Sequence, residues 1–228
     1  MFVVLFGLLA LSCLPLSVLG VLEDRDAHMY RVNIYLPPKE GRDENADILE
    51  IKTKLAGLTD IKVLLSFKEL GNSMVILVLR VDKACNWPQL TSFLARKGYE
   101  VKVTPVYYCS DVARELGLNM TRDFYDTVLE DDEDLVLGTQ IFHVKDLTTA
   151  EYDEVLRQMF VRDMGILKAG QRAACFRTLA GLPVEVIHFA PVGQKKMEAI
   201  AEILHAPGNF DFEILRIQQL DRYTGGCE

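Results

Sequence analysis

Apolar and polar side chains alternate along residues 30–36, and this period of two predicts a β-strand with one buried face. Pro37 and Pro38 end the strand, and apolar residues then return at the three- and four-residue spacing of a helix. For the first half of the chain the pattern predicts, in order, a strand at 30–36, a helix at 44–57, strands at 61–68 and 74–81, a helix at 87–98 and a strand from 99.

A second set of elements in the same order begins after residue 138. It comprises a strand at 140–145, a long helix ending near residue 170, a hairpin of strands at 174–179 and 184–189, a helix at 197–204 and a strand at 210–217. Aligning Phe67 and the residues after it with Phe176 gives an offset of 109 residues. This period is too long for a solenoid repeat and indicates a duplicated domain.

Each βαββαβ set predicts an antiparallel four-stranded sheet with both helices on one face, the ferredoxin-like arrangement of an α+β protein. We therefore expect two tandem ferredoxin-like units, at 29–107 and 139–220, joined by a linker at 108–138 that contains the acidic run 130–134. The sheet face without helices must also be covered. Pairing of the two bare faces within the chain, as an intramolecular α/β barrel, would cover both.

Residues 2–19 carry no charge, and the first charged side chain is Glu23. An apolar run of this length that ends in small residues favours a signal peptide at 1–20, cleaved after Gly20, over an uncleaved anchor. Asn119 begins an N-glycosylation sequon, which agrees with export. We therefore expect a secreted glycoprotein with no membrane association once the signal is removed.

Removal of the signal peptide leaves four cysteines, Cys85, Cys109, Cys175 and Cys227. In a βαββαβ sheet the third and fourth strands end at the same edge, about 10 Å apart, and Cys85 and Cys109 come directly after them. The sequence therefore predicts a disulfide between Cys85 and Cys109. The partners of Cys175 and Cys227 stay open, an intermolecular bond of Cys227 included. No cysteine pair and no histidine has the spacing of a metal site, so no metal is expected.

Composition narrows the function by exclusion. The 228-residue chain is 50% hydrophobic and 25% charged, as in ordinary globular proteins. Its net charge of −8 leaves no basic excess for binding nucleic acid or an anionic membrane. The sequence has no GxSxG elbow, Walker loop, GxGxxG or HExxH motif, so a serine hydrolase, a nucleotide-binding protein and a zinc protease have no support. No cofactor is expected.

Two short segments of the second half carry a family resemblance. Residues 142–145 read FHVK in a first strand, and residues 176–181 read FRTLAG after a long helix. This pattern resembles the muconolactone isomerase group of dimeric α/β-barrel proteins over residues 139–218. The resemblance implies a cavity for a small, largely apolar molecule, lactone isomerisation by proton transfer, and a functional arginine at Arg177. The family's acidic partner has no clear counterpart, so that Glu154 or Asp163 would have to substitute for it.

The alternation of the strands predicts which side chains meet. If Phe142 faces the helices, His143 and Lys145 point to the opposite face. If Ile187 and Phe189 also face the helices, His188 joins His143 on that opposite face. Together with Arg177 these histidines would form a polar group in an apolar cavity, a composition typical of a ligand site.

Histidine would carry protons in such a site, and arginine would hold a carboxylate or enolate oxygen. We therefore assign His143, Arg177 and His188 as candidate catalytic residues, with Lys145 and Asn33, which replaces His143 in the first half, as candidate ligand-binding residues. The structural alternative is that the histidines are simply hydrogen-bonded or exposed strand residues.

Two function classes follow. The first is a secreted tandem protein, monomer or homodimer, that binds a small apolar or aromatic ligand and is isomerase-like if it is an enzyme. The second is a non-catalytic extracellular interaction or structural protein whose two copies bury each other. Both classes require the same core.

Overall fold

The structure is a computed structural model, and it describes residues 28–120, 129, 134–144, 147–179, 183–204 and 210–225. The predicted signal peptide, most of the acidic run, Lys145 and Cys227 lie outside these residues. The first half contains β1 (His28–Tyr35), α1 (Glu44–Ala56), β2 (Ile61–Glu69), β3 (Met74–Val81), the short 3-10 helix η2 (Ala84–Asn86), α2 (Trp87–Arg96) and β4 (Glu100–Tyr108).

The second half repeats this order after a short helix. Its elements are α3 (Cys109–Glu115), β5 (Leu135–Phe142), α4 (Thr149–Lys168), β6 (Ala174–Thr178), β7 (Val184–Ala190), α5 (Gln194–Leu204), β8 (Phe210–Gln219) and α6 (Leu220–Gly225). β5 begins at Leu135, inside the segment expected as a linker. The sequence pattern predicted neither η2 nor α6.

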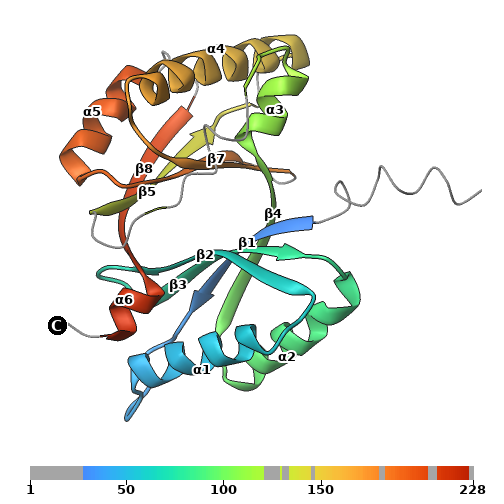
Figure 1. Cartoon of the computed structure of the whole chain (residues 1–228), viewed down its shortest axis with the longest axis vertical. Coiled ribbons are helices and arrows are strands. Elements are labelled where there is room, and N and C mark those ends of the chain that lie inside the picture. The colour runs from blue at the N-terminus through green and yellow to red at the C-terminus, as the bar shows by residue number, and fades with distance from the viewer. Residues whose placement is uncertain are drawn as a thin grey trace, which may run out of the picture.

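The eight strands form one closed antiparallel barrel in the order β1-β3-β2-β8-β5-β7-β6-β4 (Figure 1). Within each half the strand order is the same, β4-β1-β3-β2 and β8-β5-β7-β6. The halves join at two seams, β2 with β8 and β4 with β6, each of three residue pairs. The barrel thus has no free sheet edge.

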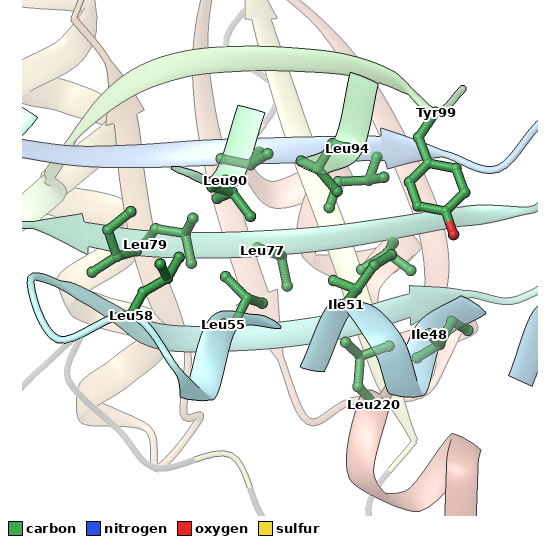
Figure 2. Packing of buried hydrophobic residues seen from close by; sticks show 14 of the residues in the cluster. Ile48, Ile51, Leu55, Leu58, Leu77, Leu79, Leu90, Leu94, Tyr99 and Leu220 are labelled. Atoms are coloured by element: carbon green, nitrogen blue, oxygen red, sulfur yellow. The ribbon is translucent and has the colours of Figure 1, made fainter. Parts of the chain in front are cut away.

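Alternation along the strands divides the apolar residues between two layers. Side chains of one parity fill the barrel, where Phe67 stacks on Phe189 at 5.1 Å and Phe176 meets Phe189 edge-on at 6.0 Å. Those of the other parity face the helices. In the first half Leu77 and Leu79 of β3 pack under α1 and α2 (Figure 2). Each fully buried Leu contributes about 1.5–3 kcal/mol.

The short helices α3 and α6 exchange between the halves. α3 follows β4 of the first half but packs on the second half, in one cluster with Phe160 and Cys175. α6 follows β8 of the second half but packs on the first, where Leu220 is buried and the Tyr223 hydroxyl donates to Glu44 at 2.8 Å. Each half is therefore covered partly by the extension of the other.

A polar pair crosses the barrel interior. Arg31 of β1 forms a largely buried ion pair with Glu185 of β7, so that the pair joins the two halves. Thr178 accepts a hydrogen bond from the Glu185 backbone N–H at 2.9 Å. The interior of the barrel thus contains packed phenylalanine rings and the ion pair between Arg31 and Glu185. Among the described residues, no helix is long and apolar enough to cross a membrane.

Candidate functional site

A cavity lies between α4, α5 and the helix-facing side of the second-half sheet. Its volume is about 40 Å³, which is room for about three water molecules. Most of its lining is apolar and comes from Ile166, Leu167, Val192, Met197, Ile200 and Phe212. Asp163 and His188 are the buried polar groups of the lining, and Gln171 and Arg172 also border it. Apolar walls with few polar groups are the usual composition of a small-molecule site.

His188 and Asp163 form the polar centre of this cavity. His188 Nε2 lies 3.3 Å from Asp163 Oδ2, and the two residues are only 7% and 5% exposed. Asp163 continues the buried stripe of α4 formed by Leu156, Met159 and Phe160, at helical spacing. α4 therefore carries a carboxylate onto the sheet at a position where its pattern calls for an apolar residue.

Two buried side chains of this interface have polar atoms that lack a hydrogen-bond partner among the described residues. They are Nδ1 of His188 and both amide atoms of Gln140, which is fully buried on β5. A buried polar atom without a partner costs about 1–3 kcal/mol, so such atoms are rare in structures without a functional reason. They mark this interface as the candidate site of the second half.

Gly138 of β5 shapes the space beside His188, its direct cross-strand partner. A Cβ atom at this position would lie 2.9 Å from the Phe212 ring and 3.3 Å from the Met197 methyl group. Both residues line the cavity. The absence of a side chain at Gly138 therefore lets the aromatic and thioether groups close over the sheet.

The predicted orientation of His188 is wrong. His188 faces the helices, because Ile187 and Phe189 turn inward and join the aromatic cluster of the barrel. His143 follows the end of β5, is exposed, and pairs with Asp211 of β8 at 3.0 Å. The two histidines are therefore not brought together.

Arg177 also faces the helices rather than the barrel. Its Nη2 donates to the hydroxyl of Tyr152 on α4 at 2.8 Å, and its guanidinium lies 5.6 Å from the centre of that ring. Burial raises the pKa of Tyr152, although Arg177 opposes the shift. Arg177 thus holds α4 against β6, and it does not line the cavity around His188.

The remaining predicted residues divide as follows. Asn33 points into the barrel, where its side-chain oxygen is buried without a hydrogen-bond partner among the described residues. The strand pairing makes Thr139, and not His143, its counterpart in the second half. Of the two acidic candidates, Glu154 is exposed and binds Arg157, which together with Gln158 lowers its pKa to about 2. Asp163 is the buried one. Asn119 is exposed, as an acceptor of glycosylation must be, and its modification stays a prediction.

The predicted disulfide between Cys85 and Cys109 is wrong. Cys109 is bonded to Cys175, and Cys85 is an exposed thiol. The prediction considered one sheet alone, whereas closure of the barrel places β4 beside β6 and aligns Tyr108 with Phe176. The cysteines that follow and precede these partners then lie within bonding range, with 5.4 Å between their Cα atoms.

Comparison with known proteins defines the fold. No family model and no curated protein matches the chain. The structure of chlorite dismutase from Candidatus Nitrospira defluvii in complex with imidazole matches with a TM-score of 0.56 and 11% identity, over 90% of this chain and 97% of that one. A further chlorite dismutase-like protein matches with a TM-score of 0.56 and 10% identity, over 87% and 98% of the two chains.

A variant of the Nitrospira enzyme in complex with cyanide also matches, with a TM-score of 0.54 and 10% identity over 88% of this chain and 95% of that one. The fold is thus α+β, with a closed eight-stranded antiparallel barrel, and it is similar to the fold of chlorite dismutase-like proteins. Likeness at these identities concerns the fold alone. The resemblance of the second half to muconolactone isomerase stays a prediction.

Proposed function

We propose that the chain binds a small, largely apolar or aromatic molecule in the cavity between α4, α5 and the second-half sheet. A cavity that holds a benzene ring has a volume of about 150 Å³, so the half-buried Ile166, Leu167 and Ile200 would move apart to widen the present 40 Å³ for a ring. The observation that carries this proposal is the buried His188–Asp163 pair at an apolar cavity wall. Asp163 accepts from His188 and orients the ring, and Nδ1 is left without a partner. A hydroxyl group on the bound molecule would donate a hydrogen bond to that nitrogen. We also interpret the two halves as ferredoxin-like units, which their common strand order supports.

If the chain is an isomerase of the kind that the family resemblance implies, His188 is the residue that moves the proton. Asp163 would stabilise the imidazolium form, and the apolar walls would exclude water. Asp163 is one of the two acidic residues of the first helix of this half that the resemblance offered as substitutes. Arg177 has no part in this chemistry, because its guanidinium is bound to Tyr152.

We further propose that the protein is secreted. The disulfide between Cys109 and Cys175 favours an oxidising compartment, and Asn119 is exposed. N-terminal sequencing of protein from the medium should find a chain beginning after Gly20. An intact Met1 in all of the recovered protein would contradict the proposal.

Titration with phenol, an aromatic ring with one hydroxyl group, tests the binding proposal. We expect a saturable shift of the Met197 methyl signal in a chain labelled with 13C at its methionine methyl groups. His188→Ala should weaken phenol binding about tenfold through loss of one hydrogen bond. His143→Ala, the same change at an exposed histidine, should leave binding unchanged. Equal binding by both variants, or no saturable shift in the natural chain, would rule out the site.

A further inference from the structure

We propose that Asp163, Cys175 and His188 form a Zn²⁺ site when the disulfide between Cys109 and Cys175 is reduced, with Cys109 as the fourth ligand. One ligand atom from each of the three residues lies within 4.8 Å of the others, and all three residues are buried. This inference does not depend on the binding of a small molecule.

The fold brings the ligands together from separate elements. Cys175 of β6 and His188 of β7 are direct cross-strand partners, so their side chains leave the same face of the sheet about 5 Å apart. α4 covers this face and adds Asp163. Cys109 begins α3, whose cluster also contains Cys175. Four ligands thus come from two strands and two helices, a rigid frame for a metal.

His188 supplies a second, independent observation. Its Nδ1 is buried and lacks a hydrogen-bond partner among the described residues. The residue as a whole is only 7% exposed. A ring nitrogen in this state either holds a proton that nothing accepts or offers an unused lone pair. Coordination of a cation by Nδ1 would remove that cost.

The donor set selects the metal. Two thiolates, an imidazole and a carboxylate suit Zn²⁺, whereas Mg²⁺ and Ca²⁺ prefer oxygen ligands alone. On a tetrahedral zinc with bonds of about 2.0–2.3 Å, ligand atoms lie about 3.3–3.8 Å apart. The ligand atoms, which lie within 4.8 Å of one another, would therefore have to approach by at most about 1.5 Å. Asp163 and His188 line the cavity, which gives the ion a path to the site.

Reduction is the step that frees the sulfur ligands. In the oxidised chain Cys175 Sγ is bonded to Cys109 Sγ. Two molecules of a low-molecular-weight thiol supply two electrons and two protons: the protein S–S bond breaks, a new S–S bond joins the two thiol molecules, and both protein sulfurs become thiols. Binding of Zn²⁺ then displaces the two thiol protons to solvent. The disulfide and the metal are thus alternative cross-links of one place in the fold.

Cobalt absorption tests the inference on the full chain. Cys13, Cys85 and Cys227 are first replaced by serine, so that Cys109 and Cys175 are the remaining thiols. After reduction, Co²⁺ should give a thiolate-to-metal charge-transfer band at one ion per chain, and Zn²⁺ should abolish that band. The oxidised chain should give none. Absence of the band in a reduced chain that circular dichroism shows to be folded would overturn the proposal.

Ligand variants separate this site from simple binding by two thiols. His188→Gln and Asp163→Asn should each weaken the binding of Zn²⁺ to the reduced chain at least tenfold. His143→Gln, at the exposed histidine, should leave it unchanged. Unchanged affinity in both ligand variants would overturn the proposal. Phenol binding is measured on the oxidised chain, so that failure of either experiment leaves the other result standing.

Discussion

Phe67 on β2 and Phe176 on β6 occupy equivalent places in the two halves. Both side chains lie inside the barrel, and the two positions differ by the repeat offset of 109 residues. The row of residues next to them on the helix-facing side can therefore be compared strand by strand. In the first half this row is Val32, Leu77 and Ser66, and in the second half it is Gly138, His188 and Cys175.

The two rows differ in the kind of side chain that they carry. Val32 and Leu77 are fully buried in the aliphatic cluster under α1 and α2. Figure 2 shows Leu77 in this cluster. In the second half a glycine leaves space, a histidine binds a carboxylate from α4, and a cysteine joins a disulfide. The same backbone arrangement therefore serves packing in one half, while in the other it holds a histidine beside a cavity and a cysteine in a disulfide.

Among the changes that test this comparison, loss of the disulfide between Cys109 and Cys175 should lower the free energy of unfolding most. Cys109→Ser with Cys175→Ser opens a loop of 66 residues, for which the chain-entropy estimate is about 4 kcal/mol. We expect a loss of that size in the free energy of unfolding, measured with urea under oxidising conditions. Cys85→Ser changes an exposed thiol and should have almost no effect. Equal stability of the double variant and the natural chain would contradict the assigned pairing.

The second largest loss of stability should come from truncation of a buried side chain in the first-half row. Leu77→Ala removes a fully buried side chain from the first-half cluster and should cost about 3 kcal/mol. Ile200→Ala enlarges an existing cavity, where fewer contacts are lost, and should cost about 1 kcal/mol. Urea unfolding of both variants measures the difference. If Ile200→Ala costs as much as Leu77→Ala, the second-half interface is packed as tightly as the first.

The His188–Asp163 pair should contribute to phenol binding and add little net stability. Asp163→Ala leaves a buried imidazole without its carboxylate and should cost about 2 kcal/mol. Changing Asp163 and His188 together to leucine should bring stability back to within about 1.5 kcal/mol of the natural chain, because both polar groups are gone. The double variant should no longer bind phenol. Retained phenol binding would remove the pair from the site.

The smallest effect concerns the N-terminus of α4. Hydrogen bonds from the side chain and backbone of Thr148 lower the pKa of Glu151, so the carboxylate stabilises the helix at pH values above the pKa of about 4.3 that it has in the unfolded chain. This contribution is lost as the pH falls through the lower folded pKa. Glu151→Gln should show a smaller fall in Tm between pH 5 and pH 3 than the natural chain. Identical pH profiles would show that the capping box adds no acid sensitivity.

Most of the fold could be predicted from periodicity. The bounds of β3 coincide with the prediction, and those of α1 and β2 differ by one residue. α6 was missed because six residues are too few to show a helical period. β5 was placed late because both parities of its first half are buried, so Leu135 and Val136 show no alternation.

The candidate site was harder to predict, because it depends on how two sheets meet. His188 was found as a residue, but its face was not, since β7 is apolar on both sides and its parity is settled by barrel closure. Asp163 had a readable signal. It follows Met159 and Phe160 at helical spacing, so an acidic residue stands on the apolar stripe of a helix. The pairing of Cys109 with Cys175 required the seam between β4 and β6.

The two seams that close the barrel are equal in length but unequal in strength. Both contain three residue pairs, yet among the residues that the structure describes only the β4–β6 seam lies beside a covalent cross-link, between Cys109 and Cys175. A mechanical load that separates the halves would therefore open the β2–β8 seam first and pull α6 from its place on the first half. The barrel would then unroll into a single sheet hinged at β4 and β6, with its phenylalanine interior turned to water.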